Sequence, residues 1–433
     1  MTFACQNYNQ AAMQYNMKNK LVEARKKKEL FTGMVVIQIF ICLIFLSLFA
    51  CINQNERSSS FNETVIDLTE AIYKPILYSE VFEKIEYIPL ETTKDCLIGN
   101  HTFASLTDKY IVIFSVQTQC AYMFDRDTGK FIKQIGSRGQ GPNEYAFSSI
   151  AFCDENESIL YFDRTTDWIG YHLETGNSQV VKQPITFSKV FFDHTSSYSV
   201  IKKFVSIDTN TYVGFVNNIS GHDSIRMVVF DKEGNIKKTF PNFQTFEPSN
   251  QLNNESFFSF KPIIGQYYQY QSSVYFKEEY NDTIYKISTD SISPHFSFFL
   301  GNKRLPYQLL GTYSKDIHDY YRIFLIGESD KYIFFNYSYN RKTQYGYFDK
   351  VKKQSFVSNS FEDGEGVFIN DLDNMPSTKF RVINKKGEFS GFLRAEKVTE
   401  FINTNRRSNL KLENLSNIKD DDNPILVIAT PKK

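Results

Sequence analysis

Residues 121–145 read AYMFDRDTGKFIKQIGSRGQGPNEY, and this stretch is the most informative part of the chain. It contains a strand pattern, a tight turn, a second strand and a glycine-rich exit. An aspartate begins the turn, and Gly129 supplies the positive φ that a short hairpin loop requires. The first half of the stretch recurs downstream, so the sequence indicates a fold built from repeats, of which a β-propeller is one.

Five repeat units are visible when the units are aligned on one aromatic position. The intervals between these positions are 47, 59, 55 and 63 residues, and the positions are Phe124, Tyr171, Phe230, Tyr285 and Phe348. A compact apolar strand precedes each unit, beginning at Tyr110, Ile159, Tyr212, Ser273 and Tyr332. Runs that are apolar on both faces favour strands covered on each side by a neighbouring sheet, as in the middle of a propeller blade.

The two ends of the chain are expected to close the ring. Residues 51–433 divided into units of about 60 residues give six blades. The strand-like segments TVIDLTE (64–70) and FEKIEYIPLE (82–91) should pair with NPILVIAT (423–430). We therefore predict an all-β fold, a six-bladed β-propeller with four-stranded antiparallel blades. A short C-terminal helix is expected from Phe392, with these residues near one face: Phe392, Leu393, Ala395, Val398 and Phe401.

The N-terminal region has the pattern of an export signal. RKKKE at 25–29 precedes a mostly apolar run at 34–50, and LFAC at 48–51 resembles a bacterial lipobox. This predicts a signal or lipobox helix and lipid attachment at Cys51; a retained signal anchor and a chance match are the alternatives. The expected organisation is a leader at 1–50, a flexible tether at 51–64 and the propeller at 65–433. The expected location is the cell envelope, periplasmic or attached to the outer membrane.

Composition narrows the classes of partner. Residues 1–50 carry six Lys or Arg and two Asp or Glu, so the remainder has a net charge of about −4, which argues against nucleic acid. Cys96, Cys120 and Cys153 would lie in an exported domain, where three buried thiols and one disulfide with a free thiol both remain open.

Several separate motifs resemble a known family. These are IPLETT (88–93), GKFIKQIGSRGQGPNEY (129–145), YNDTIYKI (280–287) and DDDNPILVI (420–428). They resemble six-bladed β-propeller lipoproteins of anaerobic Gram-negative gut bacteria and, more distantly, NHL repeats. The resemblance implies architecture and export, and it implies no catalytic residue.

The glycine-rich exit is predicted to be structural. It lacks the GK[ST] ending of a phosphate loop, so we interpret it as a crossover between blades. Its residues are Gly136, Arg138, Gly139, Gly141, Pro142, Glu144 and Tyr145, and Arg138 is expected to pair with Glu144. The six histidines are scattered without HxxH or HExxH spacing, so neither a metal site nor a cofactor is predicted.

Aromatic segments are the candidate ligand loops. GQYYQYQ (265–271) and DYYRIF (319–324) contain Tyr267, Tyr268, Tyr270, Tyr320, Tyr321 and Arg322, whose side chains could stack on a sugar or peptide; ordinary blade packing is the alternative. The leading hypothesis is a non-catalytic, monomeric recognition or assembly module for a protein, peptide or glycan. The alternatives are a carbohydrate lyase or hydrolase with a polar axial site, and a structural accessory of an outer-membrane complex.

Overall fold

The computed structural model describes most of the chain after residue 63. The described ranges are 64–99, 102–115, 117–145, 151–164, 166–184, 189–192, 195–198, 201–218, 221–247, 265–311, 315–404 and 413–433. Glu63–Lys433 forms one compact unit. The predicted leader, Cys51 and the predicted tether up to residue 63 lie outside the described residues.

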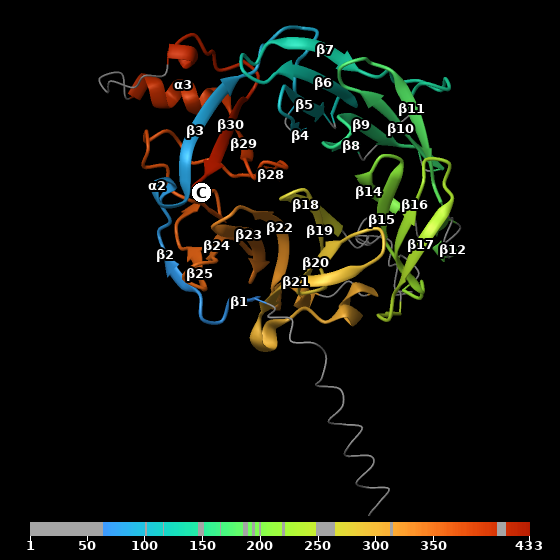
Figure 1. Ribbon diagram of the computed structural model, residues 1–433. Coiled ribbons are helices and arrows are strands. Elements are labelled where there is room, and N and C mark those ends of the chain that lie inside the picture. The colour runs from blue at the N-terminus through green and yellow to red at the C-terminus, as the bar shows by residue number, and fades with distance from the viewer. Residues whose placement is uncertain are drawn as a thin grey trace, which may run out of the picture. The chain divides into compact units, whose positions relative to one another are not determined.

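Five blades are each built from four strands that follow one another in the chain and pair antiparallel. In each blade the first strand lies nearest the middle of the propeller and the fourth lies outermost (Figure 1). The first blade is β4 (Thr102–Leu106), β5 (Tyr110–Ser115), β6 (Cys120–Asp125) and β7 (Phe131–Ile135). The second is β8 (Ala151–Asp154), β9 (Ile159–Asp163), β10 (Asp167–His172) and β11 (Ser178–Lys182).

The other three blades follow the same order. The third blade is β14 (Ile201–Asp208), β15 (Thr211–Val216), β16 (Ile225–Phe230) and β17 (Ile236–Pro241). The fourth is β18 (Gly265–Tyr270), β19 (Ser273–Glu278), β20 (Thr283–Ile287) and β21 (Ile292–Phe299). The fifth is β22 (Arg322–Glu328), β23 (Tyr332–Tyr339), β24 (Lys342–Asp349) and β25 (Gln354–Ser358).

A further four-stranded sheet joins the two ends of the described chain, and we call it the closing sheet. Its order is β28 (Val382–Ile383), β29 (Phe389–Leu393), β30 (Ile425–Pro431) and β3 (Phe82–Pro89). β3 pairs antiparallel with β30 along its length, so the predicted pairing of 82–91 with the last segment is confirmed. Five residues of β30 are completely buried; they are Ile425, Leu426, Val427, Ile428 and Ala429.

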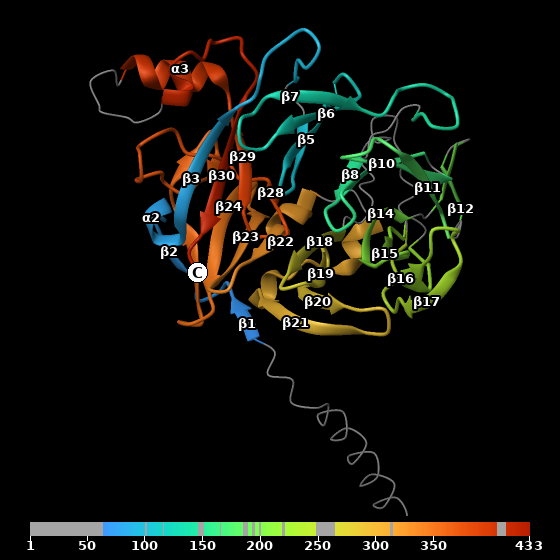
Figure 2. The same ribbon diagram turned by 45° about the horizontal axis from the view of Figure 1, so that its top comes forward.

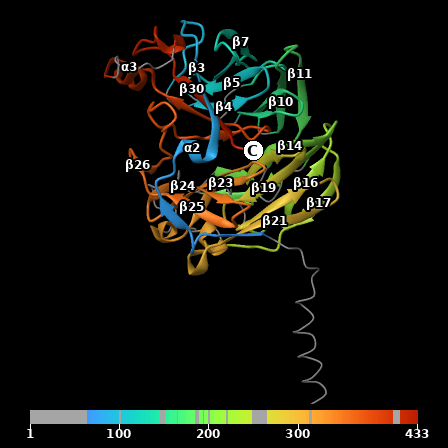
Figure 3. The same ribbon diagram turned by 60° about the vertical axis from the view of Figure 1, so that its left-hand side comes forward.

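The predicted pairing of TVIDLTE with the last strand is wrong, because this segment lies along another blade. β1 (Thr64–Asp67) pairs in parallel with β21, and β2 (Ile72–Lys74) pairs in parallel with β25. We call these two strands the N-terminal strap; Figure 3 shows its second strand beside β25. Ile66 and Leu68 anchor the strap, since both side chains are buried among aromatic residues of the fourth and fifth blades.

The prediction of six uniform four-stranded blades is therefore corrected. The structure shows five blades of consecutive strands, and two of them carry an added parallel strand from the N-terminal strap. The number of repeats could not predict these added strands. The strap strands have the same apolar pattern as a blade strand, but they add to sheets that are already complete.

The aligned repeat positions have a common structural role. The five aromatic markers lie on the third strands β6, β10, β16, β20 and β24, and the preceding apolar runs form the second strands. Gly129, Gly176 and Gly234 adopt positive φ after three of the third strands. The fifth unit lacks this glycine, and Lys353 takes a φ of 53° in the same turn.

The remaining elements are short. β12 (Lys189–Phe192) and β13 (Thr195–Tyr198) form a separate hairpin, and β26 (Phe361–Glu362) and β27 (Glu365–Gly366) extend the fifth blade. The short helices are α2 (Tyr78–Val81), η2 (Gly301–Lys303), η3 (Tyr307–Gly311), η4 (Lys315–Asp319) and η5 (Glu413–Leu415).

The C-terminal helix is shorter than predicted. α3 (Ala395–Thr404) lies beside the closing sheet (Figure 2) and buries Ala395 and Val398 against it. Phe392 and Leu393 belong to β29 and not to the helix, because strand pairing with β30 continues to Leu393.

Two further sequence questions are answered within the described residues. Cys96, Cys120 and Cys153 are all free thiols, so the alternative with a disulfide is wrong. Among the helices of the described ranges, none is both long enough and apolar enough to cross a membrane.

Candidate functional site

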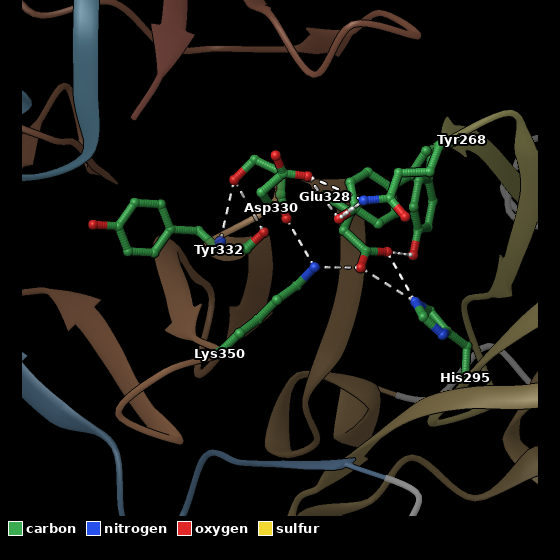
Figure 4. Close-up of polar contacts among 9 residues, drawn as sticks. Tyr268, His295, Glu328, Asp330, Tyr332 and Lys350 are labelled. Atoms are coloured by element: carbon green, nitrogen blue, oxygen red, sulfur yellow. Dashed lines mark hydrogen bonds and ion pairs between the residues drawn. The ribbon is translucent and has the colours of Figure 1, made fainter. Parts of the chain in front are cut away.

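The carboxylate of Glu328 is the centre of a polar network between the fourth and fifth blades (Figure 4). Tyr268 Oη donates a hydrogen bond to Glu328 Oε2 over 3.0 Å, and His295 Nε2 lies 3.0 Å from the same oxygen. Lys350 Nζ donates to Glu328 Oε1 over 2.5 Å. The Glu328 side chain is only 1% exposed, so its charge is held inside protein by three partners.

Strand ends bring these groups together. Glu328 is the last residue of β22 and Lys350 follows the last residue of β24, while Tyr268 and His295 lie within β18 and β21. In the same region Asp330 accepts a hydrogen bond from Tyr270 Oη over 2.9 Å. The turn after the first strand of the fifth blade is thus fixed to the fourth blade.

The electrostatics favour a permanently charged carboxylate. Burial alone would raise the pKa of Glu328, but the hydrogen bond with His295 and the charge of Lys350 outweigh burial, so this pKa is lowered. Burial and the neighbouring Glu328 charge raise the pKa of Tyr268 well above its ordinary value. Glu328 stays ionised and Tyr268 stays protonated. Their hydrogen bond therefore has a structural role, and the two groups are poorly suited to proton transfer.

A second polar group lies where the closing sheet reaches across the propeller. The turn between β28 and β29, residues 384–388, is called the axial turn here, and β28 lies near the middle of the propeller (Figure 1). Lys385 N donates to Glu155 Oε2 over 2.8 Å, and Lys385 Nζ donates to the Glu155 carbonyl oxygen over 3.2 Å. Lys386 Nζ lies 2.9 Å from Asp108 Oδ1. Asp108 follows β4 and Glu155 follows β8, so the axial turn is bound to the first and second blades.

Two more contacts hold the axial turn. Arg126 NH2 lies 2.9 Å from Glu388 Oε1, and both side chains are 13% exposed. Gly387 has a φ of 77°, and a Cβ there would lie 3.2 Å from the Glu328 carbonyl oxygen. The axial turn therefore also approaches the fifth blade.

Three groups with altered pKa values adjoin the axial turn. Burial raises the pKa of Glu155 to about 7, and the hydrogen bond and charge of Lys385 limit the rise. Burial lowers the pKa of Lys203 on β14, although the charge of Glu155 opposes this. Burial also raises the pKa of the Cys153 thiol. A carboxyl group with such a pKa can exchange a proton near neutral pH.

Metal binding has no support in the described ranges. No group of three or more His, Cys, Asp or Glu side chains there could hold an ion.

The predicted aromatic ligand residues are not gathered into one platform. Tyr267, Tyr268 and Tyr270 lie in β18 and not in a loop, and their alternation sends Tyr267 into a different hydrophobic cluster from the other two. Tyr321 stacks on Tyr339 with ring centroids 4.5 Å apart, and Tyr320 packs in the cluster that contains Tyr267. Arg322 Nε donates to Glu279 Oε1 over 2.6 Å. Only Tyr268 and Tyr270 adjoin the Glu328 network.

The predicted blade crossover is a compact turn. Gly139 N donates to the Tyr145 carbonyl over 3.0 Å, and Gly141 N donates to Glu144 Oε2 over 2.8 Å. The expected ion pair of Arg138 with Glu144 does not occur, because the glutamate folds back onto the turn. Arg164 of the second blade donates to the Pro142 carbonyl over 3.0 Å and so ties the crossover to that blade. Gly136 adopts a φ of 69° at its start.

Sequence reasoning missed the residues at the centre of both polar groups. Glu328 and Lys350 belong to the fifth blade, Glu155 to the second and Lys203 to the third. They share no local motif, and His295 was only one of six scattered histidines. A usable signal for Glu328, Glu155 and Lys350 was their position at or just after the end of an apolar strand, where several turns meet at one side of a propeller.

The comparisons with known proteins give one family and several solved structures to which this chain is similar. A family described as "Domain of unknown function (DUF4934)" matches residues 63–430. The crystal structure of a "Putative exported protein (BF0058)" from Bacteroides fragilis NCTC 9343 is similar with a TM-score of 0.64 at 18% identity, covering 86% of this chain and 99% of that chain. A member of the DUF4221 family from Bacteroides vulgatus has a TM-score of 0.45 at 12% identity, covering 81% and 97%. No curated protein matches the chain.

Proposed function

We propose that this chain, which belongs to the DUF4934 family, is a lipid-anchored extracytoplasmic β-propeller that acts as a non-catalytic recognition or assembly module. Cys51 carries the lipid and the following residues tether the domain to the membrane of the cell envelope. The partner is a protein, peptide or glycan, and the domain acts as a monomer.

The axial turn is the observation that carries the non-catalytic assignment. A propeller enzyme with an axial site needs an open mouth where polar groups from several blades meet substrate. Here the axial turn lies beside the ends of the first strands of the first and second blades, where the ion pair of Lys386 with Asp108 and the contacts of Lys385 with Glu155 hold it. The Glu328 carboxylate beside this turn has three partners already.

Export is supported by the sequence. The apolar run at 34–50 and LFAC at 48–51 have the pattern that export and lipid attachment require. The name of the similar Bacteroides fragilis protein also refers to export.

Binding without turnover is the property to test. Purified 51–433 carrying Cys51→Ala is immobilised and exposed to envelope extract, and each retained component is then purified and titrated against the domain. The proposal expects saturable binding of one component that is recovered chemically unchanged. Cleavage or elimination in that component would contradict the assignment.

A carbohydrate-active enzyme is the second candidate, and Glu155 favours it. A carboxyl group whose pKa is about 7 suits a general acid at neutral pH. The test measures release of reducing or unsaturated sugar ends from a panel of polysaccharides. Activity that is lost in Glu155→Gln but kept in Glu174→Gln would support the enzyme. Glu174→Gln is the control, since Glu174 is an exposed carboxylate on another turn.

A further inference from the structure

Exposed apolar side chains lie beside the first strand of the N-terminal strap. Val65 of β1 is 49% exposed and Phe299 of β21 is 51% exposed. In the parallel pairing of these strands, Val65 lies opposite Ser297 and Asp67 lies opposite Phe299. Side chains in these positions point to one face of the sheet, opposite to the buried side chain of Ile66. Val65 and Phe299 are therefore diagonal neighbours on an open face.

The turn between β24 and β25, residues 350–353, adjoins the strap. Gln354 Nε2 donates to the Glu70 carbonyl oxygen over 2.9 Å, which holds the start of β25 beside the link between the two strap strands. Val351 in this turn is 77% exposed, and Lys352 next to it is exposed as well. The turn thus adds a projecting apolar side chain and positive charge to the surface beside the strap.

The end of β21 adjoins the same link of the strap. Leu68 N donates to the Phe299 carbonyl oxygen over 3.1 Å, and a Cβ on Gly301 of η2 would lie 3.1 Å from Thr69 Cγ2. The link therefore joins the end of β21 to the turn before β25. We call the outward groups along it the strap surface, which consists of Val65, Phe299, Lys303, Val351, Lys352 and Lys353.

The strap surface lies in a basic part of an acidic domain. Segments 64–74, 299–304 and 349–354 together contain six Lys or Arg and three Asp or Glu, which is a local excess of three positive charges. Residues 51–433 as a whole have a net charge of about −4. Local positive charge beside exposed apolar side chains favours a partner that is both anionic and apolar.

The place of β1 in the chain indicates which such partner is near. Twelve residues separate Cys51 from Thr64, and they span at most about 40 Å even when fully extended. With the lipid at Cys51 that the proposed function includes, and on which this step rests, β1 is held close to the bilayer. The first blade lies on the other side of the ring from β1 (Figure 1), so the strap surface belongs to the side of the domain nearest the membrane.

We propose that the strap surface docks on the anionic phospholipid headgroups of the membrane that holds the anchor. Val351 and Phe299 enter the interfacial region of the bilayer, and the lysines of the strap surface lie among the headgroups. Apolar burial and attraction to anionic lipids both contribute to such binding. Docking fixes the orientation of the propeller, with the strap toward the bilayer and the first blade accessible to a large partner.

Vesicle binding of the anchor-free domain tests the docking separately from acylation. Domain 51–433 carrying Cys51→Ala is sedimented with vesicles of phosphatidylglycerol and phosphatidylethanolamine, or of phosphatidylcholine alone. We expect partitioning at least about tenfold stronger into the anionic vesicles, and a decrease at high salt because screening shortens the reach of the lysine charges. Equal partitioning into both kinds of vesicle, or dimerisation of the domain without vesicle binding, would overturn the proposal. Absence of a lipid label at Cys51 would refute the anchor and is measured independently.

Matched charge variants locate the binding. Lys352→Gln combined with Lys353→Gln should weaken partitioning into the anionic vesicles at least about fivefold, and Val351→Asp should do the same. Lys130→Gln combined with Lys133→Gln removes the same charge beside β7 of the first blade and should leave partitioning within about twofold of the parent domain. Equal losses in the two double variants would mean general electrostatic attraction and would refute the docking surface.

Tryptophan fluorescence shows which side chain enters the bilayer. Trp168 is the only natural tryptophan and is completely buried, so an added tryptophan reports its own surroundings. Brominated phospholipids in anionic vesicles should quench the emission added by Val351→Trp. Ile132→Trp is the control, because Ile132 is 44% exposed on β7, and its added emission should stay unquenched. Equal quenching of the two, or quenching of neither, would overturn the proposed orientation.

Discussion

The backbone N–H of Lys385 donates to the carboxylate of Glu155 over 2.8 Å, although 230 residues separate the two in the chain. The contact joins the closing sheet to the second blade across the middle of the propeller. Because the pKa of Glu155 is raised to about 7, this contact is made to a group that changes charge near neutral pH.

Stability should fall as the pH rises from about 4.5 to about 7. The pKa of Glu155 is near 4.5 when unfolded and about 7 when folded, so in this window the folded state binds more protons than the unfolded state. The free energy of unfolding, measured in urea at several pH values, should decrease less steeply for Glu155→Gln than for the parent domain. Glu233→Gln changes an exposed carboxylate and is the control; identical slopes in all three proteins would refute the assignment.

Removing the charge of Glu328 should destabilise the domain strongly. Glu328→Gln leaves the ammonium of Lys350 beside an amide inside protein, and breaking a buried ion pair in this way costs about 3 kcal/mol. Urea unfolding of 51–433 gives the measurement. The double variant Glu328→Gln with Lys350→Met should recover part of the loss, and a loss of equal size in Glu233→Gln would argue against a specific role.

The N-terminal strap should contribute to stability through Ile66. This side chain is completely buried between the fourth and fifth blades, so Ile66→Ala should lower the free energy of unfolding by about 2–4 kcal/mol. Val65 lies on the same strand but is 49% exposed, and Val65→Ala should change the same quantity by less than about 1 kcal/mol. Equal effects of the two substitutions would mean that the strap does not pack as described.

The pairing of β3 with β30 should be essential for the closed ring. Deletion of 423–433 removes β30 and exposes the strands on both sides of it, so thermal unfolding should shift far downward or lose cooperativity. Val427→Ala, which removes a completely buried side chain of β30, should cost about 2 kcal/mol in the same calorimetric experiment. An unchanged melting transition after the deletion would contradict this closure.

Lipid attachment predicts a change of location when Cys51 is replaced. Cys51→Ala removes the residue that would be acylated, so less of the protein should remain in the membrane fraction and the retained form should carry no lipid label. Labelling with an alkyne fatty acid, followed by fractionation, measures both. Lipid labelling that persists in Cys51→Ala would refute acylation at this residue, and Cys96→Ala is the control.

Much of the fold could be predicted because propeller strands carry local signals. Compact apolar runs placed the second strands, and turn glycines such as Gly129 and Gly176 placed the hairpins. The N-terminal strap could not be predicted, because parallel addition to a finished sheet uses the same alternation as a strand inside a blade. The helix boundary was misplaced because Phe392 and Leu393 fit both a helical and a strand pattern.

The residues that form the candidate sites could not be predicted from the sequence, for a different reason. Tyr268 was selected as an aromatic ligand residue, yet its role depends on Glu328 and His295 from other strands. No local sequence pattern indicates that the ends of first strands from separate blades lie close together on one side of the propeller.

The sequence by itself determined the repeat, the β class and the pairing of the last strand with 82–91, because these follow from patterns of apolar residues and turn residues within short segments. Only the folded chain shows that the strap adds to the outer edges of two blades, that the axial turn contacts the first and second blades, and which charges meet there. Those outcomes depend on the curvature of stacked sheets, which brings residues hundreds of positions apart within hydrogen-bonding distance and sets how much water each charge retains.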